Sequence, residues 1–286
     1  MFHVSFPNLN IFIQIKPKFF DFLGISVYYY GVIISISFIL GAFCVFWNFK
    51  NRNKKLYKLY NINENSLIDV LILVFITGII GARIYYVLFS PVKFNNLKEI
   101  LNIYAGGIAI YGAIISASIS LFLFCKLKNI NFLFILDLLV PGLLLAQSIG
   151  RWGNFFNQEA FGSATNNILA MKSEATNFEL VHPCFLYESI WCLLGFIIIL
   201  FIFNKKNKKN INILAIFFDH ELNFYLIWYS FGRFFIESLR TDSLILKIFN
   251  KNIKISQIIS LILFITLIFV LIFKNKNSSK TKSSRH

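Results

Sequence analysis

The chain has few charged residues for its length. Only 14% of its 286 residues are charged, whereas a soluble domain typically carries about 25%. Hydrophobic residues make up 57% of the chain, and they form long continuous runs rather than an alternating pattern. Helices and closed barrels are the backbones that satisfy their own hydrogen bonds in lipid, and continuous runs favour helices. The scarcity of charge therefore excludes an ordinary soluble protein and predicts an all-α polytopic membrane protein.

Cysteine is also scarce. The four cysteines form no CxxC pair, and three of them lie inside apolar runs, where cysteine behaves as a small hydrophobic residue. We therefore expect neither a disulfide framework nor a cysteine metal site. Residues 1–20 lack a basic segment followed by an apolar core, so a cleaved signal peptide is not expected.

Seven apolar runs approach the length of about 20 residues that a helical span needs. The predicted spans are about 28–48, 67–90, 106–125, 131–150, 184–204, 221–238 and 255–273. Asp219, His220 and Glu221 interrupt an apolar run, so the sixth span is expected to begin after them, and the role of segment 205–220 stays open. We predict one transmembrane domain over 1–273 and a basic, disordered cytoplasmic tail over 274–286.

Basic residues alternate between the two sides of these predicted spans. Segments 49–66, 126–130, 205–210 and 274–286 hold 16 of the 28 lysines and arginines. By the positive-inside rule these segments are cytoplasmic, which places the N-terminus outside and the C-terminus inside. The net charge of +15 then reflects topology and anionic lipid headgroups rather than nucleic acid.

Arginine is the unusual cation in this chain, with only six arginines against 22 lysines. Arg83, Arg151, Arg233 and Arg240 all fall near the predicted outer ends of spans, where few cations are expected. A guanidinium grips phosphate with a planar fork, and lysine offers only a point charge. The arginines therefore indicate a functional site at the outer face. Each could instead simply pair with a carboxylate, for which Glu188 and Glu237 are available.

Four motifs in this order resemble the prolipoprotein diacylglyceryl transferase family, a group of bacterial enzymes. They are GGIAIYGA (106–113), GRWGNFFNQEAFG (150–162), HPCFLYE (182–188) and GRFFIESLRTD (232–242). The resemblance implies a multi-pass enzyme of the bacterial cytoplasmic (inner) membrane with its active site toward the outer face. Its substrates would be phosphatidylglycerol and the lipobox cysteine of preprolipoproteins. It would form a thioether and release glycerol 1-phosphate, with no metal or organic cofactor.

The resemblance also implies roles for individual residues. Arg151 and Arg233 would be the essential phosphate-binding pair, and Tyr111 stands where some members carry a histidine proposed to help deprotonate the thiol. Tyrosine could act as this base only if its pKa were strongly lowered. Further positions that match the family are expected to contact substrate: Tyr30, Arg83, Asn154, Glu159, Gly162, His182, Glu188, Tyr229, Glu237 and Arg240.

Two other functions remain compatible with the residues alone. A transporter or flippase for anionic lipids could use outer-face arginines as a gate, although transporters usually show repeats and a midplane site, and no repeat stands out here. A non-catalytic membrane assembly factor would tolerate replacement of Arg151 by lysine, which an enzyme that depends on two-point phosphate binding would not.

Overall fold

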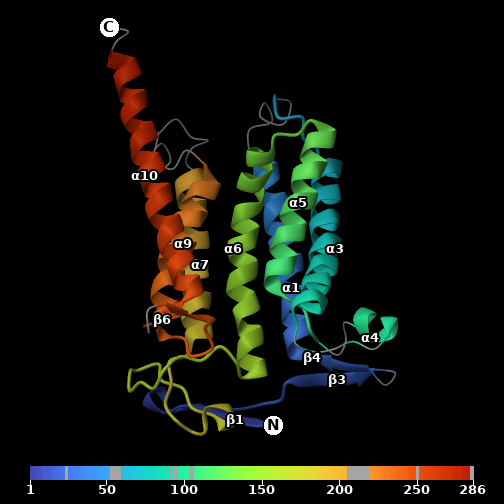
Figure 1. Cartoon of the computed structure of the whole chain (residues 1–286), viewed down its shortest axis with the longest axis vertical. Coiled ribbons are helices and arrows are strands. Elements are labelled where there is room, and N and C mark those ends of the chain that lie inside the picture. The colour runs from blue at the N-terminus through green and yellow to red at the C-terminus, as the bar shows by residue number, and fades with distance from the viewer. Residues whose placement is uncertain are drawn as a thin grey trace. The chain divides into compact units, whose positions relative to one another are not determined.

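The computed structural model describes residues 1–22, 25–51, 59–90, 92, 94, 96–102, 106–204, 220–248 and 251–283. These residues are mostly helical (Figure 1) and divide into two compact units. The first unit is Met1–Asn48 with Asp137–His286, and the second unit is Phe49–Leu136. Each unit is described by itself below. Residues 205–219, most of the segment whose role the sequence leaves open, lie outside the described residues.

Five long helices lie wholly or mainly in the first unit, and each runs antiparallel to the next. They are α1 (Tyr29–Asn51), α6 (Phe132–Asn157), α7 (Cys184–Asn204), α9 (Glu221–Leu239) and α10 (Ile255–Ser283). The start of α1 lies against the end of α6, where Tyr29 stacks on Phe156 at 4.5 Å. The end of α6 meets the start of α7, and the end of α9 meets the starts of α7 and α10. One end of the unit therefore collects the termini of all five helices.

The second unit is an antiparallel pair of long helices with a short one between them. Its elements are α3 (Glu64–Phe89), α4 (Leu97–Leu101) and α5 (Ile110–Lys128). Asparagines mark the ends, because their short side chains cap helices and tolerate the left-handed region. Asn63 accepts from the backbone N–H of Ser66 at 2.8 Å, and Asn129 ends α5 with φ 53°.

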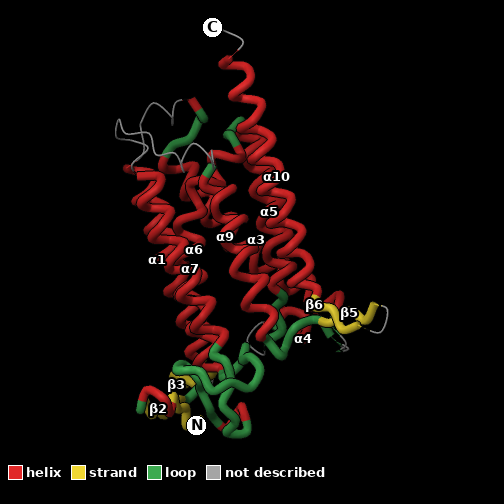
Figure 2. Tube along the Cα trace, turned by 90° about the vertical axis from the view of Figure 1, so that its left-hand side faces the viewer, coloured by secondary structure: helices red, strands yellow, loops and turns green. Residues whose placement is uncertain are grey.

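The described residues also form three antiparallel hairpins, which the sequence analysis did not predict. They pair β1 (Phe2–Phe6) with β2 (Ile11–Ile15), β3 (Lys18–Phe22) with β4 (Ile25–Tyr28), and β5 (Ile245–Ile248) with β6 (Lys251–Lys254). In the first unit, β1 joins the loop that follows α6 through reciprocal backbone bonds between Ser5 and Lys172, both 2.9 Å. Figure 2 shows the loop that follows α6 beside the N-terminal strands.

Six of the described helices are long and apolar enough to cross a membrane, namely α1, α3, α5, α6, α7 and α10. The chain is therefore a polytopic, mostly α-helical membrane protein, as predicted. Two helices continue seven or more residues beyond the predicted limits. The helix α6 continues to Asn157, seven residues beyond the predicted end, so Arg151 and Asn154 lie on a helix and not after one. The helix α10 continues to Ser283, whereas we predicted a disordered tail from 274.

Glycine allows two of these helices to cross closely. A Cβ on Gly41 of α1 would lie 2.8 Å from the carbonyl oxygen of Gly142 on α6. Small residues at such crossings are typical of membrane helices, which lack a hydrophobic driving force for association in lipid. The contact fixes α1 against α6, the helix that carries Arg151.

Candidate active site

Glu188 of α7 is buried, with 5% of its surface exposed, and three arginines surround its carboxylate. Its Oε2 lies 2.5 Å from Nη2 of Arg151, and its Oε1 lies 2.8 Å from Nη1 of Arg233 and 3.0 Å from Nη1 of Arg240. A buried charge is tolerated only when it is paired and hydrogen-bonded. One carboxylate therefore holds three guanidinium groups, from α6, α9 and the residue that follows α9.

Two of these arginines have a second acidic partner. Nη2 of Arg233 lies 2.6 Å from Oε2 of Glu237, one helical turn away, and Arg240 binds both carboxylate oxygens of Asp242 at 2.9 and 2.6 Å. The arginine side chain with the largest exposed fraction is Arg151, at 25%. We call these three arginines with Glu188, Glu237 and Asp242 the arginine cluster. The side chains of Arg233 and Arg240 are 18% and 12% exposed.

Arg240 and its acidic partners stabilise one another's charged forms. Burial opposes the charge on this side chain, but the bonds to Asp242 and the charge of Glu188 outweigh it and raise the pKa of Arg240. Burial likewise opposes the charge on Asp242, and the bonds from Arg240 outweigh it and lower the pKa of Asp242. Both side chains therefore stay ionised at neutral pH.

A pair of tryptophans fixes the register of α7 and α9 beside the cluster. Trp191 and Trp228 stack with their ring centroids 4.2 Å apart, and each indole N–H donates to the other residue's backbone carbonyl at 3.0 Å. Gly195 and Gly232 leave the space that the two indoles occupy. Because the stack allows little sliding, it sets where α7 and α9 place their charged residues.

The end of α6 arranges several of the predicted site residues. The ring of Tyr30 lies against Gly153, where an added Cβ would approach it to 2.7 Å. The side-chain amide of Asn154 donates to Glu159 at 2.8 Å, and the backbone N–H of Glu159 donates to the carbonyl of Asn154 at 3.1 Å. Tyr30 and Tyr229 both lie within electrostatic range of Arg151. The end of α6 therefore brings Tyr30, Asn154 and Glu159 together near Arg151.

The loop between α6 and α7 contacts the end of α9 through its backbone. Gly162 donates its backbone N–H to the carbonyl of His182 at 2.8 Å and forms a β-bridge with Arg240. The ring Nδ1 of His182 lies 3.2 Å from both the side-chain amide of Asn167 and the hydroxyl of Tyr187. Burial lowers the pKa of His182, so its imidazole is neutral at pH 7.

Arg83 and Tyr111 belong to the second unit. The buried guanidinium of Arg83 donates to four backbone carbonyls, those of Glu99, Ile100, Gly106 and Gly107, at 2.7 to 2.8 Å. The two glycines have φ of 85° and 78°, a conformation that suits glycine. These bonds favour a structural role for Arg83, which fixes the turn before α5. Tyr111, the second residue of α5, is 42% exposed.

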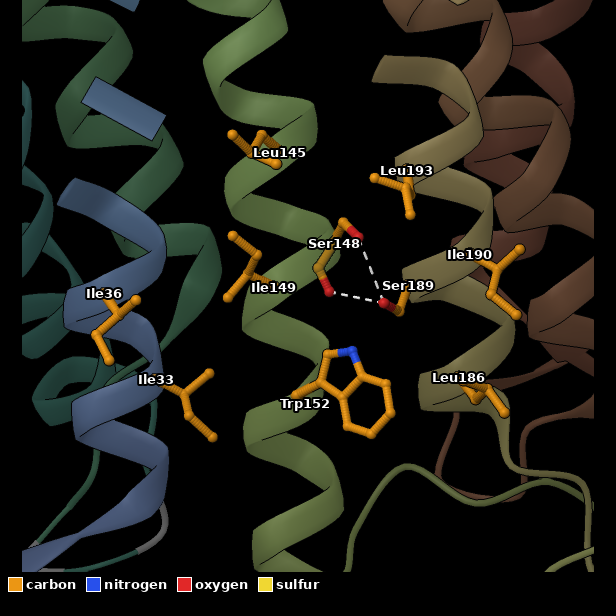
Figure 3. A pocket seen from close by; sticks show the side chains of 10 residues that line it. All are labelled: Ile33, Ile36, Leu145, Ser148, Ile149, Trp152, Leu186, Ser189, Ile190 and Leu193. Carbon is orange, nitrogen blue, oxygen red and sulfur yellow. Dashed lines mark hydrogen bonds between the residues drawn. The ribbon is translucent and has the colours of Figure 1, made fainter. Parts of the chain in front are cut away.

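A largely apolar pocket of about 470 Å³ lies between α1, α6 and α7. It is lined by Ile33 and Ile36 of α1, by Leu145, Ser148, Ile149 and Trp152 of α6, and by Leu186, Ser189, Ile190 and Leu193 of α7 (Figure 3). The hydroxyl of Ser189 donates to the carbonyl of Ser148 at 2.8 Å, which satisfies a polar group within this wall. Trp152 follows Arg151 and Ser189 follows Glu188 in the sequence, but consecutive helix residues face different sides. No residue of the arginine cluster lines this pocket.

The sequence analysis missed three parts of this site. Asp242 lies two residues after Arg240, and that spacing could have indicated the pair. The stacking of Trp191 on Trp228 has no signal in the sequence, because it depends on tertiary packing. The same holds for Lys254, whose ammonium group donates to main-chain carbonyls at the end of α9. Within the described residues, no group of three or more histidine, cysteine or acidic side chains could hold a metal ion.

Comparison with known proteins identifies the family. The model of the prolipoprotein diacylglyceryl transferase family matches residues 17–273. A phosphatidylglycerol--prolipoprotein diacylglyceryl transferase from Prochlorococcus marinus is 40% identical over 97% of this chain and 99% of its own length. Proteins of the same name from Pediococcus pentosaceus and Staphylococcus aureus are each 38% identical over 92% of this chain and 91% of their own. The chain therefore belongs to the prolipoprotein diacylglyceryl transferase family.

Proposed function

We propose that this chain transfers the diacylglyceryl group of phosphatidylglycerol to the lipobox cysteine thiol of preprolipoproteins. Family membership and the names of its relatives support this reaction, which is the first step of lipoprotein maturation. The observation that carries the proposal to particular residues is the carboxylate of Glu188, which three guanidinium groups bind at 2.5 to 3.0 Å. Guanidinium groups that bind one buried carboxylate in this way can bind a phosphate through the same donors.

The headgroup phosphate would bind chiefly to Arg151 and Arg233. Of the three arginine side chains in the cluster, that of Arg151 has the largest exposed fraction, and Arg233 binds Glu188 from α9. A phosphate that approaches Arg151 competes with Glu188 for its donors, and Glu188 retains Arg233 and Arg240 as partners. The apolar pocket between α1, α6 and α7 offers room for part of a lipid acyl chain.

The reaction forms one bond and breaks another. The substrate thiolate attacks the glyceryl carbon that bears the phosphate ester, and a carbon–sulfur bond replaces the carbon–oxygen bond. The electron pair of the broken bond leaves with glycerol 1-phosphate, whose growing charge the arginines stabilise. The thiol proton must pass to a base, because the thiolate is the nucleophile. Tyr111 remains the proposed base, and Tyr30, Asn154, Glu159, Gly162, His182, Tyr229 and Glu237 remain proposed contacts of the substrates.

We also propose seven membrane crossings, in which α9, the sixth along the chain, joins the six candidate spans. Its 19 residues span about 28 Å at 1.5 Å each, close to the hydrocarbon thickness of about 30 Å. It runs antiparallel between α7 and α10, both of which are candidate spans. The lysine-rich connections then lie in the cytoplasm, and the arginine cluster faces the outer side of the bacterial inner membrane.

A reconstituted assay tests this function. Purified protein in detergent, given phosphatidylglycerol and a lipobox peptide, should yield a diacylglyceryl peptide and equimolar glycerol 1-phosphate. The variant Arg151→Lys should lose about 100-fold in turnover, because lysine lacks the two-point grip on phosphate. Arg285→Lys makes the same exchange in the basic tail and should be as active as wild type.

Each other outcome identifies a different function. Lipid flux into liposomes without a covalent product would favour a transporter. Lipid binding with an unmodified peptide would contradict the transferase. Full activity in Arg151→Lys would leave the transferase in place but remove Arg151 from the proposed phosphate site.

A further inference from the structure

Lys254 ends strand β6 and reaches the end of α9. Its Nζ donates to the backbone carbonyls of Glu237, Ser238 and Arg240 at 2.9, 3.0 and 2.5 Å. An ammonium group has three N–H donors, so these three bonds use all of them. No carboxylate is needed to explain the position of this lysine, because the three acceptors are all main-chain oxygens.

The end of α9 needs such a cation. The last four carbonyls of a helix have no partner within the helix, and they carry partial negative charge. The last turn of α9, which is described throughout, contains no basic residue. The β5–β6 hairpin supplies one instead, since it pairs Ile245 with Lys254 and returns the chain to the end of α9. The backbone N–H of Ile255 then donates to the carbonyl of Leu244 at 3.0 Å, which closes the hairpin.

Two of the three carbonyls belong to residues of the arginine cluster. The side chain of Glu237 binds Arg233, and the side chain of Arg240 binds Glu188 and Asp242. On another side of the same main chain, Ser163 donates its backbone N–H to the carbonyl of Leu239 at 2.8 Å. The segment that carries Arg240 is therefore held by a loop on one side and by Lys254 on another.

Resting on the proposed function, we propose that Lys254 is a positioning residue for the headgroup phosphate. It acts through Arg240 and Glu237, because its donors are used on the main chain. Without Lys254, the end of α9 loses three charge-assisted hydrogen bonds, and the backbone of Arg240 is no longer held in position. Arg240 then holds Glu188 less precisely, and Glu188 holds Arg151 and Arg233. The expected result is weaker capture of the anionic lipid, with the chemical step itself little changed.

The variant Lys254→Met tests this role, because methionine has a similar length but no charge and no donor. We expect the KM for phosphatidylglycerol to rise about tenfold, the scale of one lost charge-assisted hydrogen bond. The kcat should stay within about twofold of wild type. Lys254→Arg keeps the charge and several donors and should restore most of the affinity. Lys16→Met removes an exposed lysine elsewhere in the chain and should leave KM unchanged.

A double-mutant cycle with Arg240→Gln separates positioning from a loss of general stability. If Lys254 acts through Arg240, then Lys254→Met should add little to the KM effect of Arg240→Gln. Independent effects that multiply, or an unchanged KM in Lys254→Met, would overturn the proposal. If Lys254→Met does not fold, Lys254→Gln retains two N–H donors and is judged by the same criteria.

The same measurements distinguish this proposal from the proposed function. If wild-type protein makes no thioether product, the transferase proposal fails. The affinity of each variant for vesicles that contain phosphatidylglycerol then still tests Lys254. Equal affinity of wild type and Lys254→Met in that experiment would overturn the positioning role by itself.

Discussion

Gly232 of α9 lies directly against the indole of Trp191 on α7, and no side chain fits between them. Gly232 immediately precedes Arg233, and Trp191 lies one turn after Glu188. The stacked pair of Trp191 and Trp228 therefore sets the distance between Glu188 on α7 and Arg233 on α9. A packing contact between α7 and α9 thus controls the distance between Arg233 and Glu188.

The substitution Gly232→Ala should disturb this contact. The added methyl group overlaps the Trp191 ring, and overpacking of this kind costs about 1–3 kcal/mol. We expect a lower thermal unfolding temperature in detergent and a fall in kcat/KM of about tenfold or more, because the Arg233–Glu188 distance changes. Calorimetry and the peptide assay measure the two effects.

Gly78→Ala provides the matched control. An added Cβ at Gly78 of α3 would meet nothing within 4 Å, so this variant should match wild type in both measurements. If Gly232→Ala and Gly78→Ala behave alike, the tryptophan stack does not set the geometry of the site.

The substitution Arg83→Lys should lower stability and leave lipid affinity intact. Lysine cannot span the four carbonyls that the Arg83 fork reaches, and unsatisfied buried acceptors cost about 1–3 kcal/mol. We expect the free energy of unfolding to fall by about 2 kcal/mol and the KM for phosphatidylglycerol to stay within about twofold. Chemical denaturation and steady-state kinetics provide the two values.

Lys126→Arg, the reverse exchange at an exposed position of α5, should change neither value. A higher KM in Arg83→Lys with unchanged stability would support the direct substrate contact that the family resemblance implies for Arg83.

The stability of the protein should depend on pH through His182. Burial lowers the pKa of His182 below the ordinary 6.5, so folding favours the neutral imidazole. Its contribution to stability is therefore complete above pH 6.5 and is lost as the pH falls through the lowered value. The unfolding temperature should drop between pH 7.5 and pH 5 by more in wild type than in His182→Gln.

His286→Gln, in the predicted basic tail, controls for histidine replacement as such. The same drop in wild type and His182→Gln would show that His182 contributes nothing to the pH dependence.

The helices could be predicted from the sequence because long apolar runs reflect the thickness of the bilayer. The end of α6 could not, since Asn154 and Asn157 resemble a loop. The helix continues there because Phe155 packs with Phe185 and with Val4 of the N-terminal hairpin, a contact between distant parts of the chain. The hairpins were missed because each of their strands has only four or five residues.

In the candidate site, too, some features could be predicted from the sequence and others could not. The sequence analysis gave pairing with a carboxylate only as the alternative to a functional site, and the structure pairs Arg233 with both Glu237 and Glu188. The number of arginines that share Glu188 was not predicted. Three arginines share this carboxylate because α6, α7 and the end of α9 meet at one point. That meeting point depends on helix packing, which a single sequence does not reveal.

The pairing of Arg233 with Glu237 also bears on how the chain enters the membrane. An arginine and a glutamate one turn apart on α9 can neutralise each other before any other helix is present. Glu188 lies on α7, which leaves the ribosome earlier than α9. In the proposed topology, the acceptor for Arg233 is therefore already in the bilayer when the arginine arrives. The order of the helices along the chain thus reduces the cost of inserting a charged span.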